Sequence, residues 1–350
     1  MNSKVEVNVG GVKIGGKNRV VIQSMTNTDT HDAESTLKQI NALYEAGAEI
    51  VRVAYPDKEC YASFKKIIGE SPCPIVADIH FDAKLAIDAI RCGAHKIRIN
   101  PGNINKKSLV EIIEAAKAAG IPIRIGVNSG SLEKDILERH GSPTEEALVE
   151  SAERSIQFFE SNGFKNLVVS IKSSDVMHMI RSNMLLKNKC EYPIHLGVTE
   201  AGGLLRGSIK NSIGVSNLIL NGVGDTIRVS LSENPEKEVE AAKIILKSMH
   251  MYTKAPDIIS CPTCSRTTFD VIGTSRQIED ILKKSRKNIK VAVMGCVVNG
   301  PGESAEADFG ITGSGNTCVL FKKGKIILQG DRELVYNRLL KEMEEYEPEN

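Results

Sequence analysis

The sequence predicts a parallel (β/α)₈ TIM-like barrel followed by a small α/β domain, and three observations carry this prediction. Eight short apolar segments alternate with segments of helical periodicity over roughly residues 20–250. Aromatic residues make up 4% of the chain and Trp is absent, so the core is built from the aliphatic residues that buried parallel strands use. The rhythm changes after Met251, and 350 residues suffice for a barrel and a second domain. We expect a barrel domain over residues 1–254 and a small domain over residues 255–350.

The barrel is expected to follow an N-terminal β-hairpin in residues 1–19, where Val alternates with other residues and four glycines mark turns. Segments with an apolar residue every three or four positions separate the strands and predict helices. Ser142-Pro143-Thr144-Glu145 has the pattern of a capping box at the start of one such helix. A doubly wound open sheet is the structural alternative. The eight expected strands are Val20–Ser24, Ile50–Ala54, Ile75–Ile79, Lys96–Asn100, Ile121–Val127, Leu167–Ile171, Ile194–Val198 and Thr226–Leu231.

Charge and hydropathy exclude several classes of protein. The chain has 45 basic and 44 acidic residues, so its net charge of +1 gives no reason to expect binding to nucleic acid or to an anionic membrane. No apolar run approaches the length of about 18 residues that a membrane span needs, and the N-terminus lacks a signal-peptide pattern. We expect a cytoplasmic protein. Its eight cysteines are then candidates for metal or redox chemistry rather than for disulfides.

The expected small domain has a strand at Asp257–Ser260, a helix at about 268–284, a strand at Lys290–Met294, short strands within 309–329 and a terminal helix from Asp331. A helix that connects two strands of one sheet as a crossover makes the strands parallel. The strands at 257–260 and 290–294 are therefore expected to be neighbours. This arrangement places Cys261 and Cys296 at adjacent strand ends.

Three cysteines form the most specific motif of the chain. Cys261 and Cys264 are spaced as Cys-x-x-Cys, and the fold argument brings Cys296 beside them, whereas Cys318 lies in an apolar alternation and is expected in the core. A structural zinc site normally has four Cys or His ligands, and a [4Fe–4S] cluster needs one protein ligand for each iron. Glu303 is the nearest candidate for a fourth ligand. The spacing favours iron–sulfur over zinc, and a redox dithiol or coincidence remains as a further alternative.

Polar residues stand late in the predicted barrel strands, where active sites of such barrels lie. Five strands contribute a cation, and within several strands the polar residues are two apart and share one face. Buried cations that converge need an anion, and the planar guanidinium suits phosphate oxygens. A di- or triphosphate-sized anion is the predicted ligand. The residues are Arg52, Asp78, His80, Arg98, Asn100, Arg124, Asn128, Ser170, Lys172, His195, Thr199, Glu200, Arg228 and Ser230.

Two motifs give a family resemblance. Ser260-Cys261-Pro262-Thr263-Cys264-Ser265-Arg266 and Met294-Gly295-Cys296-Val297-Val298-Asn299-Gly300-Pro301-Gly302-Glu303 resemble the cluster-binding motifs of the 4-hydroxy-3-methylbut-2-enyl diphosphate synthase family. The resemblance covers the whole chain, in the short bacterial form with two domains. Ser265 departs from the Gly expected there, which removes no ligand.

The resemblance implies a [4Fe–4S] cluster held by Cys261, Cys264, Cys296 and Glu303. It also implies a homodimer and an electron carrier that is flavodoxin or ferredoxin. The substrate would be 2-C-methyl-D-erythritol 2,4-cyclodiphosphate. In the family, the small domain of one subunit caps the barrel of the other.

The same resemblance suggests roles for the barrel residues. Glu200 corresponds to a carboxylate near the reacting carbons, and whether Glu200 or Asp78 acts as acid or base stays open; Glu303 is the third candidate for a catalytic role. The residues that resemble the substrate-binding set are Arg52, His80, Arg98, Asn100, Arg124, Asn128, Lys172, Arg228 and Ser230.

The implied reaction is reductive opening of the cyclic diphosphate with loss of a hydroxyl as water, driven by two electrons. Two other functions stay open from the residues alone. One is a non-catalytic barrel that binds a phosphorylated ligand and carries a zinc-stabilised domain. The other is an iron–sulfur phosphosugar dehydratase, which needs no external electrons.

Overall fold

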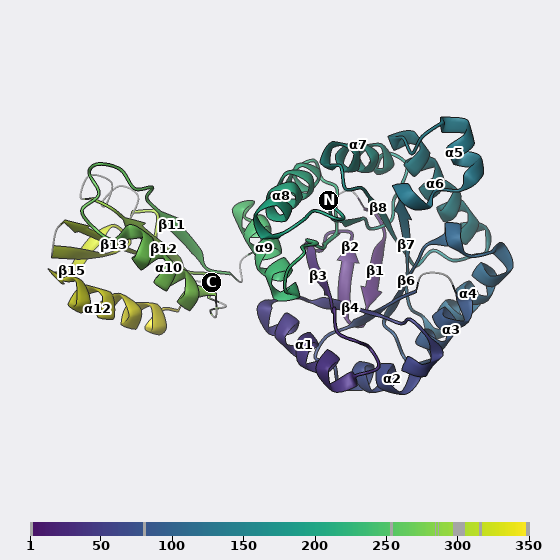
Figure 1. Cartoon of the computed structure of the whole chain (residues 1–350), viewed down its shortest axis with the longest axis horizontal. Coiled ribbons are helices and arrows are strands. Elements are labelled where there is room, and N and C mark those ends of the chain that lie inside the picture. The colour runs from purple at the N-terminus through teal and green to yellow at the C-terminus, as the bar shows by residue number, and fades with distance from the viewer. Residues whose placement is uncertain are drawn as a thin grey trace. The chain divides into compact units, whose positions relative to one another are not determined.

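The computed structural model describes residues 3–79, 82–252, 255–283, 285, 287–296, 305–314 and 317–347. The chain divides into two compact units, Met1–Met251 and Tyr252–Asn350 (Figure 1). Among the described helices, none combines the length and the hydropathy that a membrane-spanning helix requires. The two units are described separately below.

The first unit is an eight-stranded parallel barrel, as predicted. Its hydrogen-bonded strand order is β8-β7-β6-β5-β4-β3-β10-β9, and a parallel bridge between Val169 and Ile194 links β8 back to the residue before β9. This bridge closes the ring, so the alternative of a doubly wound open sheet is wrong. The strands are β3 (Val21–Met25), β4 (Ile50–Ala54), β5 (Ile75–Asp78), β6 (Lys96–Ile99), β7 (Ile123–Asn128), β8 (Leu167–Lys172), β9 (His195–Leu196) and β10 (Thr226–Ile227).

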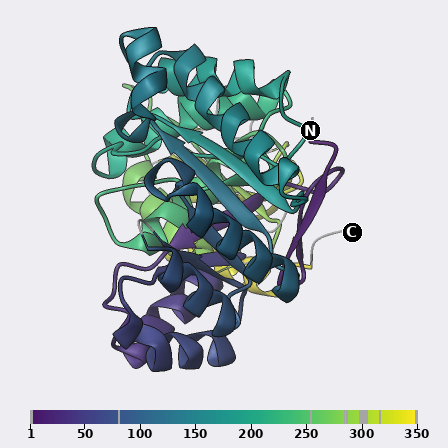
Figure 2. The same cartoon turned by 90° about the vertical axis from the view of Figure 1, so that its right-hand side faces the viewer.

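Helices surround this ring of strands (Figures 1 and 2). They are α1 (Ala33–Ala46), α2 (Tyr61–Glu70), α3 (Ala83–Arg91), α4 (Lys106–Ala119), α5 (Lys134–His140), α6 (Glu145–Ser161), α7 (Val176–Lys187), α8 (Leu204–Leu220) and α9 (Pro235–Ser248). Short 3₁₀ helices η1 (Lys58–Cys60), η2 (Pro101–Asn103) and η3 (Ser129–Ser131) follow three of the strands.

The start of α6 differs from the predicted capping box. Thr144, rather than Ser142, is the N-cap residue: its hydroxyl accepts a hydrogen bond from the Ala147 N–H at 3.2 Å. Thr144 has an extended backbone and the helix begins at Glu145, so Pro143 lies before the helix. A side-chain hydroxyl caps the helix, as predicted, but it belongs to Thr144, two residues after Ser142.

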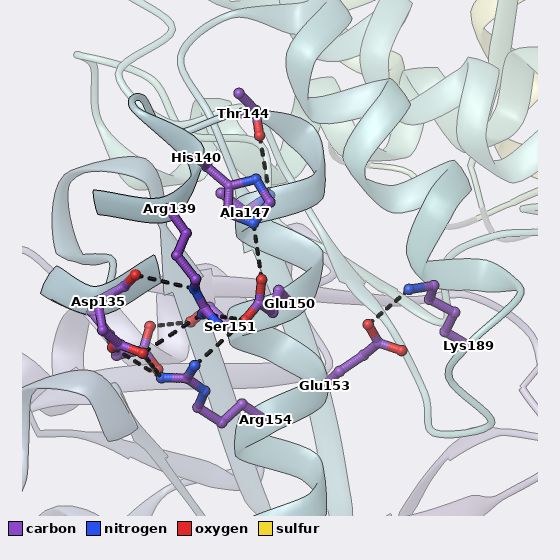
Figure 3. A network of polar contacts seen from close by, with 11 residues as sticks. Asp135, Arg139, His140, Thr144, Ala147, Glu150, Ser151, Glu153, Arg154 and Lys189 are labelled. Atoms are coloured by element: carbon purple, nitrogen blue, oxygen red, sulfur yellow. Dashed lines mark hydrogen bonds and ion pairs between the residues drawn. The ribbon is translucent and has the colours of Figure 1, made fainter. Parts of the chain in front are cut away.

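The short helix α5 is an addition that the sequence did not predict. Surface ion pairs tie it to α6 (Figure 3). Arg154 donates to the Asp135 carboxylate at 2.8 and 3.0 Å, and the His140 ring lies 2.9 Å from Glu150. Because these groups are solvent-exposed, the network positions α5 and contributes little to stability.

The hairpin of β1 (Glu6–Val9) and β2 (Val12–Gly15) closes one end of the barrel (Figure 2). Val7, Val9 and Ile14 pack against Val21, Ile50, Val76 and Val168, which lie at the beginnings of four barrel strands. The amino-terminal end of the barrel is therefore filled by apolar side chains. Asp78, Arg98 and Lys172, by contrast, lie at or near the carboxyl ends of their strands.

In its described residues, the second unit is a five-stranded sheet with two helices. The strand order is β11-β12-β13-β14-β15; β11, β12 and β13 are parallel, and the last two pairs are antiparallel. Cys318 is 1% exposed and belongs to the core formed with the helices, as predicted. The elements are β11 (Asp257–Ser260), α10 (Val271–Leu282), β12 (Lys290–Met294), β13 (Phe309–Ser314), β14 (Thr317–Lys322), β15 (Lys325–Asp331) and α12 (Arg332–Glu345).

Candidate active site

The interior of the barrel, above its apolar plug, contains a cluster of cations. Five of them are at most 9% exposed although Arg and Lys are rarely buried without a partner. Arg98 on β6 pairs in register with Arg124 on β7, so neighbouring strands present guanidinium groups at one level. We call the following six residues the cation cluster: Arg52, Lys96, Arg98, Arg124, Lys172 and Arg228.

Two buried carboxylates neutralise part of this cluster. Asp78 lies 3.3 Å from Arg98 Nη1 and 3.7 Å from Arg52 Nε. Glu238, on α9, accepts hydrogen bonds from Arg228 Nε and Nη2, both at 3.2 Å, and from the Leu231 N–H at 3.0 Å. Asp78 thus orients two guanidinium groups, and Glu238 orients one.

The rest of the cluster lacks such a counter-charge within the described part of the chain. Arg124 Nε and Nη1 and Arg98 Nε are buried without a hydrogen-bond partner there. Burial lowers the pKa values of Arg124, Lys172 and Lys96 well below their ordinary values, and neighbouring Arg side chains lower them further. Burial likewise lowers the pKa of Arg52 to about 10. Such an arrangement is costly unless an anion binds to it.

The remaining barrel residues take different positions. Asn100 is buried and accepts a hydrogen bond from the Gly102 N–H at 3.1 Å, and Asn128 ends β7. Ser170 is buried on β8, Thr199 is half-buried beyond β9, and Ser230 is half-buried two residues after Arg228. His80 lies outside the described residues.

His195 is fully buried on β9, where its Nδ1 lies 2.7 Å from the Thr226 hydroxyl. Burial and the nearby cations lower its pKa, so the ring is neutral. This environment suits a hydrogen-bonding histidine. Its Nε2 has no partner among the described residues.

Glu200 is exposed and adopts φ of 51°, in the left-handed region that Glu rarely occupies. It lies four residues beyond β9, in a turn followed by Gly202 with φ of 100°. Unfavourable backbone conformations of this kind concentrate at functional sites. The conformation agrees with a functional role for this carboxylate.

Sequence reasoning missed several residues of this site. Lys96 precedes Arg98 by two positions on the same strand, so the period-two pattern that flagged Arg98 could have found it. Glu238 and Gly126 carried no such signal. A Cβ atom at Gly126 would come within 3.0 Å of Arg98 Nε, so this glycine makes room for the guanidinium.

Replacing Arg124 should raise the stability of the ligand-free protein and abolish the further stabilisation that a bound anion gives. Arg124→Met removes a buried charge that lacks a counter-charge, so the free energy of unfolding should rise by about 1 kcal/mol or more. Inorganic diphosphate should raise the melting temperature of the wild type and barely change that of the variant. Thermal denaturation by circular dichroism, with and without diphosphate, measures both effects.

Asp78→Asn is the matched comparison, because it leaves Arg52 and Arg98 with less counter-charge. It should lower the free energy of unfolding by about 3–5 kcal/mol. A fall in stability for Arg124→Met, together with an unchanged diphosphate response, would contradict the assignment of an anion site.

The second unit brings the motif cysteines to the ends of neighbouring strands. The Cys261 N–H donates to the Val293 carbonyl at 2.9 Å, so Cys261 continues the pairing of β11 with β12. Cys296 stands two residues beyond β12, and its carbonyl accepts a hydrogen bond from the Thr312 hydroxyl at 3.1 Å. The adjacency predicted for β11 and β12 is confirmed. Glu303 lies outside the described residues.

Cys264 is exposed in the turn after Cys261. The Thr267 hydroxyl accepts from the Cys264 N–H at 3.0 Å, and it also donates to the Cys264 sulfur at 3.9 Å. The backbone N–H of Arg266 and the Thr267 hydroxyl lower the thiol pKa of Cys264. A thiol that ionises readily is suited to bind a metal or a cluster. Three thiols on two adjacent loops are soft donors, which iron and zinc both accept.

Another group with metal-ligand atoms close together is His31, Asp57 and Cys60. The His31 ring already lies 2.7 Å from Asp29 and 3.0 Å from Asp57, and Asp57 caps η1. Burial raises the thiol pKa of Cys60 to about 12. We therefore interpret this group as an ion-pair link between two loops.

In the protein without bound metal, Cys264 should be the cysteine that alkylates fastest among the described ones. Its lowered pKa and its exposure favour a reactive thiolate, whereas burial raises the thiol pKa of Cys318. Iodoacetamide labelling followed by peptide mass spectrometry measures the order. Thr267→Val should slow the reaction of Cys264 alone; equal rates at Cys264 and Cys318 would contradict this account.

Comparison with known proteins identifies the family. Residues 4–243 match the GcpE TIM-barrel domain, and residues 257–345 match the GcpE protein C-terminal domain. Relatives described as "4-hydroxy-3-methylbut-2-en-1-yl diphosphate synthase (flavodoxin)" include the protein of Caldanaerobacter subterraneus subsp. tengcongensis, with 51% identity over 97% of this chain and 96% of the relative. The Aquifex aeolicus protein has 48% identity over 98% of this chain and 96% of its own length.

Solved structures resemble the chain in fold alone. Dihydropteroate synthase of Yersinia pestis has a TM-score of 0.50 and 14% identity, and covers 71% of this chain and 100% of its own. The Stenotrophomonas maltophilia enzyme has a TM-score of 0.50 and 17% identity, over 70% of this chain and 98% of its own.

The resemblance to the synthase family is confirmed, as is the prediction of an oxidoreductase of isoprenoid biosynthesis. The chain belongs to the GcpE family, whose curated relatives at this similarity are 4-hydroxy-3-methylbut-2-en-1-yl diphosphate synthases.

Proposed function

We propose that the chain converts 2-C-methyl-D-erythritol 2,4-cyclodiphosphate to 4-hydroxy-3-methylbut-2-enyl diphosphate by reductive ring opening and dehydroxylation. The observation that carries the proposal is the cation cluster, whose positive charge exceeds that of its buried carboxylates. A diphosphate supplies the missing negative charge, and guanidinium groups bind its oxygens in pairs. Family membership supplies the identity of the reaction.

The barrel residues bind and orient the substrate in this proposal. The guanidinium groups of Arg52, Arg98 and Arg228 are already held by Asp78 and Glu238, so their donors are placed before the diphosphate arrives. Arg124 and Lys172 contribute positive charge that no ion pair among the described residues neutralises, and the diphosphate would neutralise it. Asn100, Asn128, Ser230 and His80 complete the predicted binding set, and Glu200 is the predicted acid–base residue.

A [4Fe–4S] cluster fits the donor set of the second unit. Cys261, Cys264 and Cys296 would hold it, with Glu303 as the fourth predicted ligand. The described residues support this through the adjacent strand ends and through the lowered pKa of the Cys264 thiol. Such a cluster supplies electrons one at a time. Thiolate ligands favour it, whereas a carboxylate is a harder and more easily displaced ligand.

The relatives are named as flavodoxin-dependent, so we propose flavodoxin as the electron carrier, with ferredoxin as the alternative. All eight cysteines are free, which agrees with a reducing cytoplasmic environment.

Protein purified without oxygen should contain about four iron atoms per chain and negligible zinc. Turnover of the cyclodiphosphate should require a reductant, because the product contains two more electrons. Glu303→Ala should lower both iron content and rate. Iron and zinc analysis, with product measured with and without reduced flavodoxin, tests the proposal.

Each rival predicts a different result. Stoichiometric zinc without turnover would favour the non-catalytic barrel. Turnover in the absence of any reductant would favour a dehydratase. Full cluster content and an unchanged rate for Glu303→Ala would refute its role as a ligand.

We further propose a homodimer, supported by an unusual surface on α8. Four apolar side chains on this helix are exposed by half or more, namely Leu205 at 77%, Ile209 at 51%, Ile213 at 53% and Leu220 at 73%. The first three are spaced four residues apart and form one stripe. Apolar stripes of this kind mark contact surfaces.

The double variant Leu205→Glu and Ile209→Glu should be monomeric, because four carboxylates would meet in a symmetric apolar contact. Light scattering after size-exclusion chromatography gives the mass. Leu137→Glu, on α5, replaces an exposed apolar residue outside the stripe and should leave the mass unchanged. A dimer that persists in the double variant would exclude α8 as the interface.

A further inference from the structure

We propose that this barrel binds the ring-opened, linear diphosphate more tightly than the cyclic diphosphate, and that Lys96, which the sequence did not single out, contributes to the difference. The inference rests on the proposed function and extends it to the charge that develops during the reaction. Lys96 acts here through its electric field as a positioning residue, since within the described part of the chain its side chain hydrogen-bonds to Gln23 alone.

The charge of the site exceeds what the cyclic substrate can neutralise. Within the described residues the cation cluster has six members, and it forms ion pairs with two carboxylates, Asp78 and Glu238. Four positive charges are left when every cation is protonated. Each phosphorus of a cyclic diphosphate bears one ionised oxygen, so the substrate carries two negative charges and leaves an excess of two.

Ring opening changes this balance. When the ester C–O bond breaks heterolytically, its electron pair stays on the phosphate oxygen, and the diester end becomes a terminal phosphate with roughly one further negative charge. Two electrons from a one-electron carrier and one proton then complete the conversion, and a water molecule leaves. The dianion thus becomes a trianion. The site is better matched to the charge after bond cleavage than to the charge before it, which is the requirement for catalysis by differential binding.

Lys96 is placed to contribute to this match. It is 0% exposed at the start of β6, and its ammonium lies 3.3 Å from Gln23 Oε1 on β3. Burial, followed by Arg124 and then Arg52, lowers its pKa. In the free protein its proton is therefore weakly held. An additional negative charge nearby stabilises the ammonium form, so that a more negative ligand is accompanied by proton uptake.

The experiment compares the two ligands in the oxidised holoenzyme without reductant, where no turnover occurs. Calorimetry should show the linear product binding about tenfold more tightly than the cyclodiphosphate, which is the usual size of one added charged interaction. Repeating the titrations in two buffers with different ionisation enthalpies should show greater proton uptake with the product. In Lys96→Met, both the affinity ratio and the extra proton uptake should shrink.

Controls separate this inference from the proposed function. Lys165→Met removes an exposed lysine in the loop before β8, outside the barrel interior, and should keep the wild-type ratio. Lys96→Gln provides a second neutral variant if Lys96→Met folds poorly. If neither ligand binds the wild type, the proposed function is wrong. If both bind and the ratio is near one, or if both Lys96 variants weaken the two ligands equally, the function stands and the inference is overturned.

Discussion

The structure depends on one electrostatic constraint, the burial of more cations than carboxylates inside a barrel. Parallel strands place residues two positions apart on the same face, so Lys96 and Arg98 both enter the interior once β6 is in register. The register then aligns Arg98 with Arg124 and with Asp78 on its other neighbour. A hydrophobic interior would be more stable than this one. The apolar hairpin plug and the aliphatic outer faces of the strands must offset the cost.

The two buried carboxylates explain how the site remains folded without a ligand. Asp78 belongs to the barrel wall and contacts guanidinium groups from strands on either side of it. Glu238 reaches the site from a surrounding helix and also accepts from the Leu231 N–H and the Ser24 hydroxyl. Together they fix three guanidinium groups, and the other cations of the cluster have no carboxylate partner among the described residues. The protein thereby keeps both a defined geometry and an affinity for anions.

Most of the fold followed from the sequence because its signals are local. Eight aliphatic strands at regular spacing predict the barrel, and their polar late positions predict where its chemistry lies. The missed features depend on tertiary contacts. In the sequence Glu238 is one of several acidic residues of a helix, and its role emerges only when α9 packs against β3. The helix α5 is held by side-chain ion pairs, and the cap at Thr144 competes with an equally good sequence pattern at Ser142. Lys96 is the exception, since period two alone could have found it.

The cation cluster of the barrel and the cysteine motif of the small unit place their charged groups in different environments. In the barrel, burial lowers the pKa values of Arg124 and Lys172, because it destabilises their charged forms. Binding of an anion would stabilise these charged forms. In the small unit, the Cys264 thiol stays exposed, and backbone N–H groups stabilise its thiolate. Burial raises the thiol pKa of Cys318 in the core of the same unit, so this thiol stays protonated. The exposed Cys264 thiol and the buried cations therefore lie in different environments, and the two separately folded units supply one each.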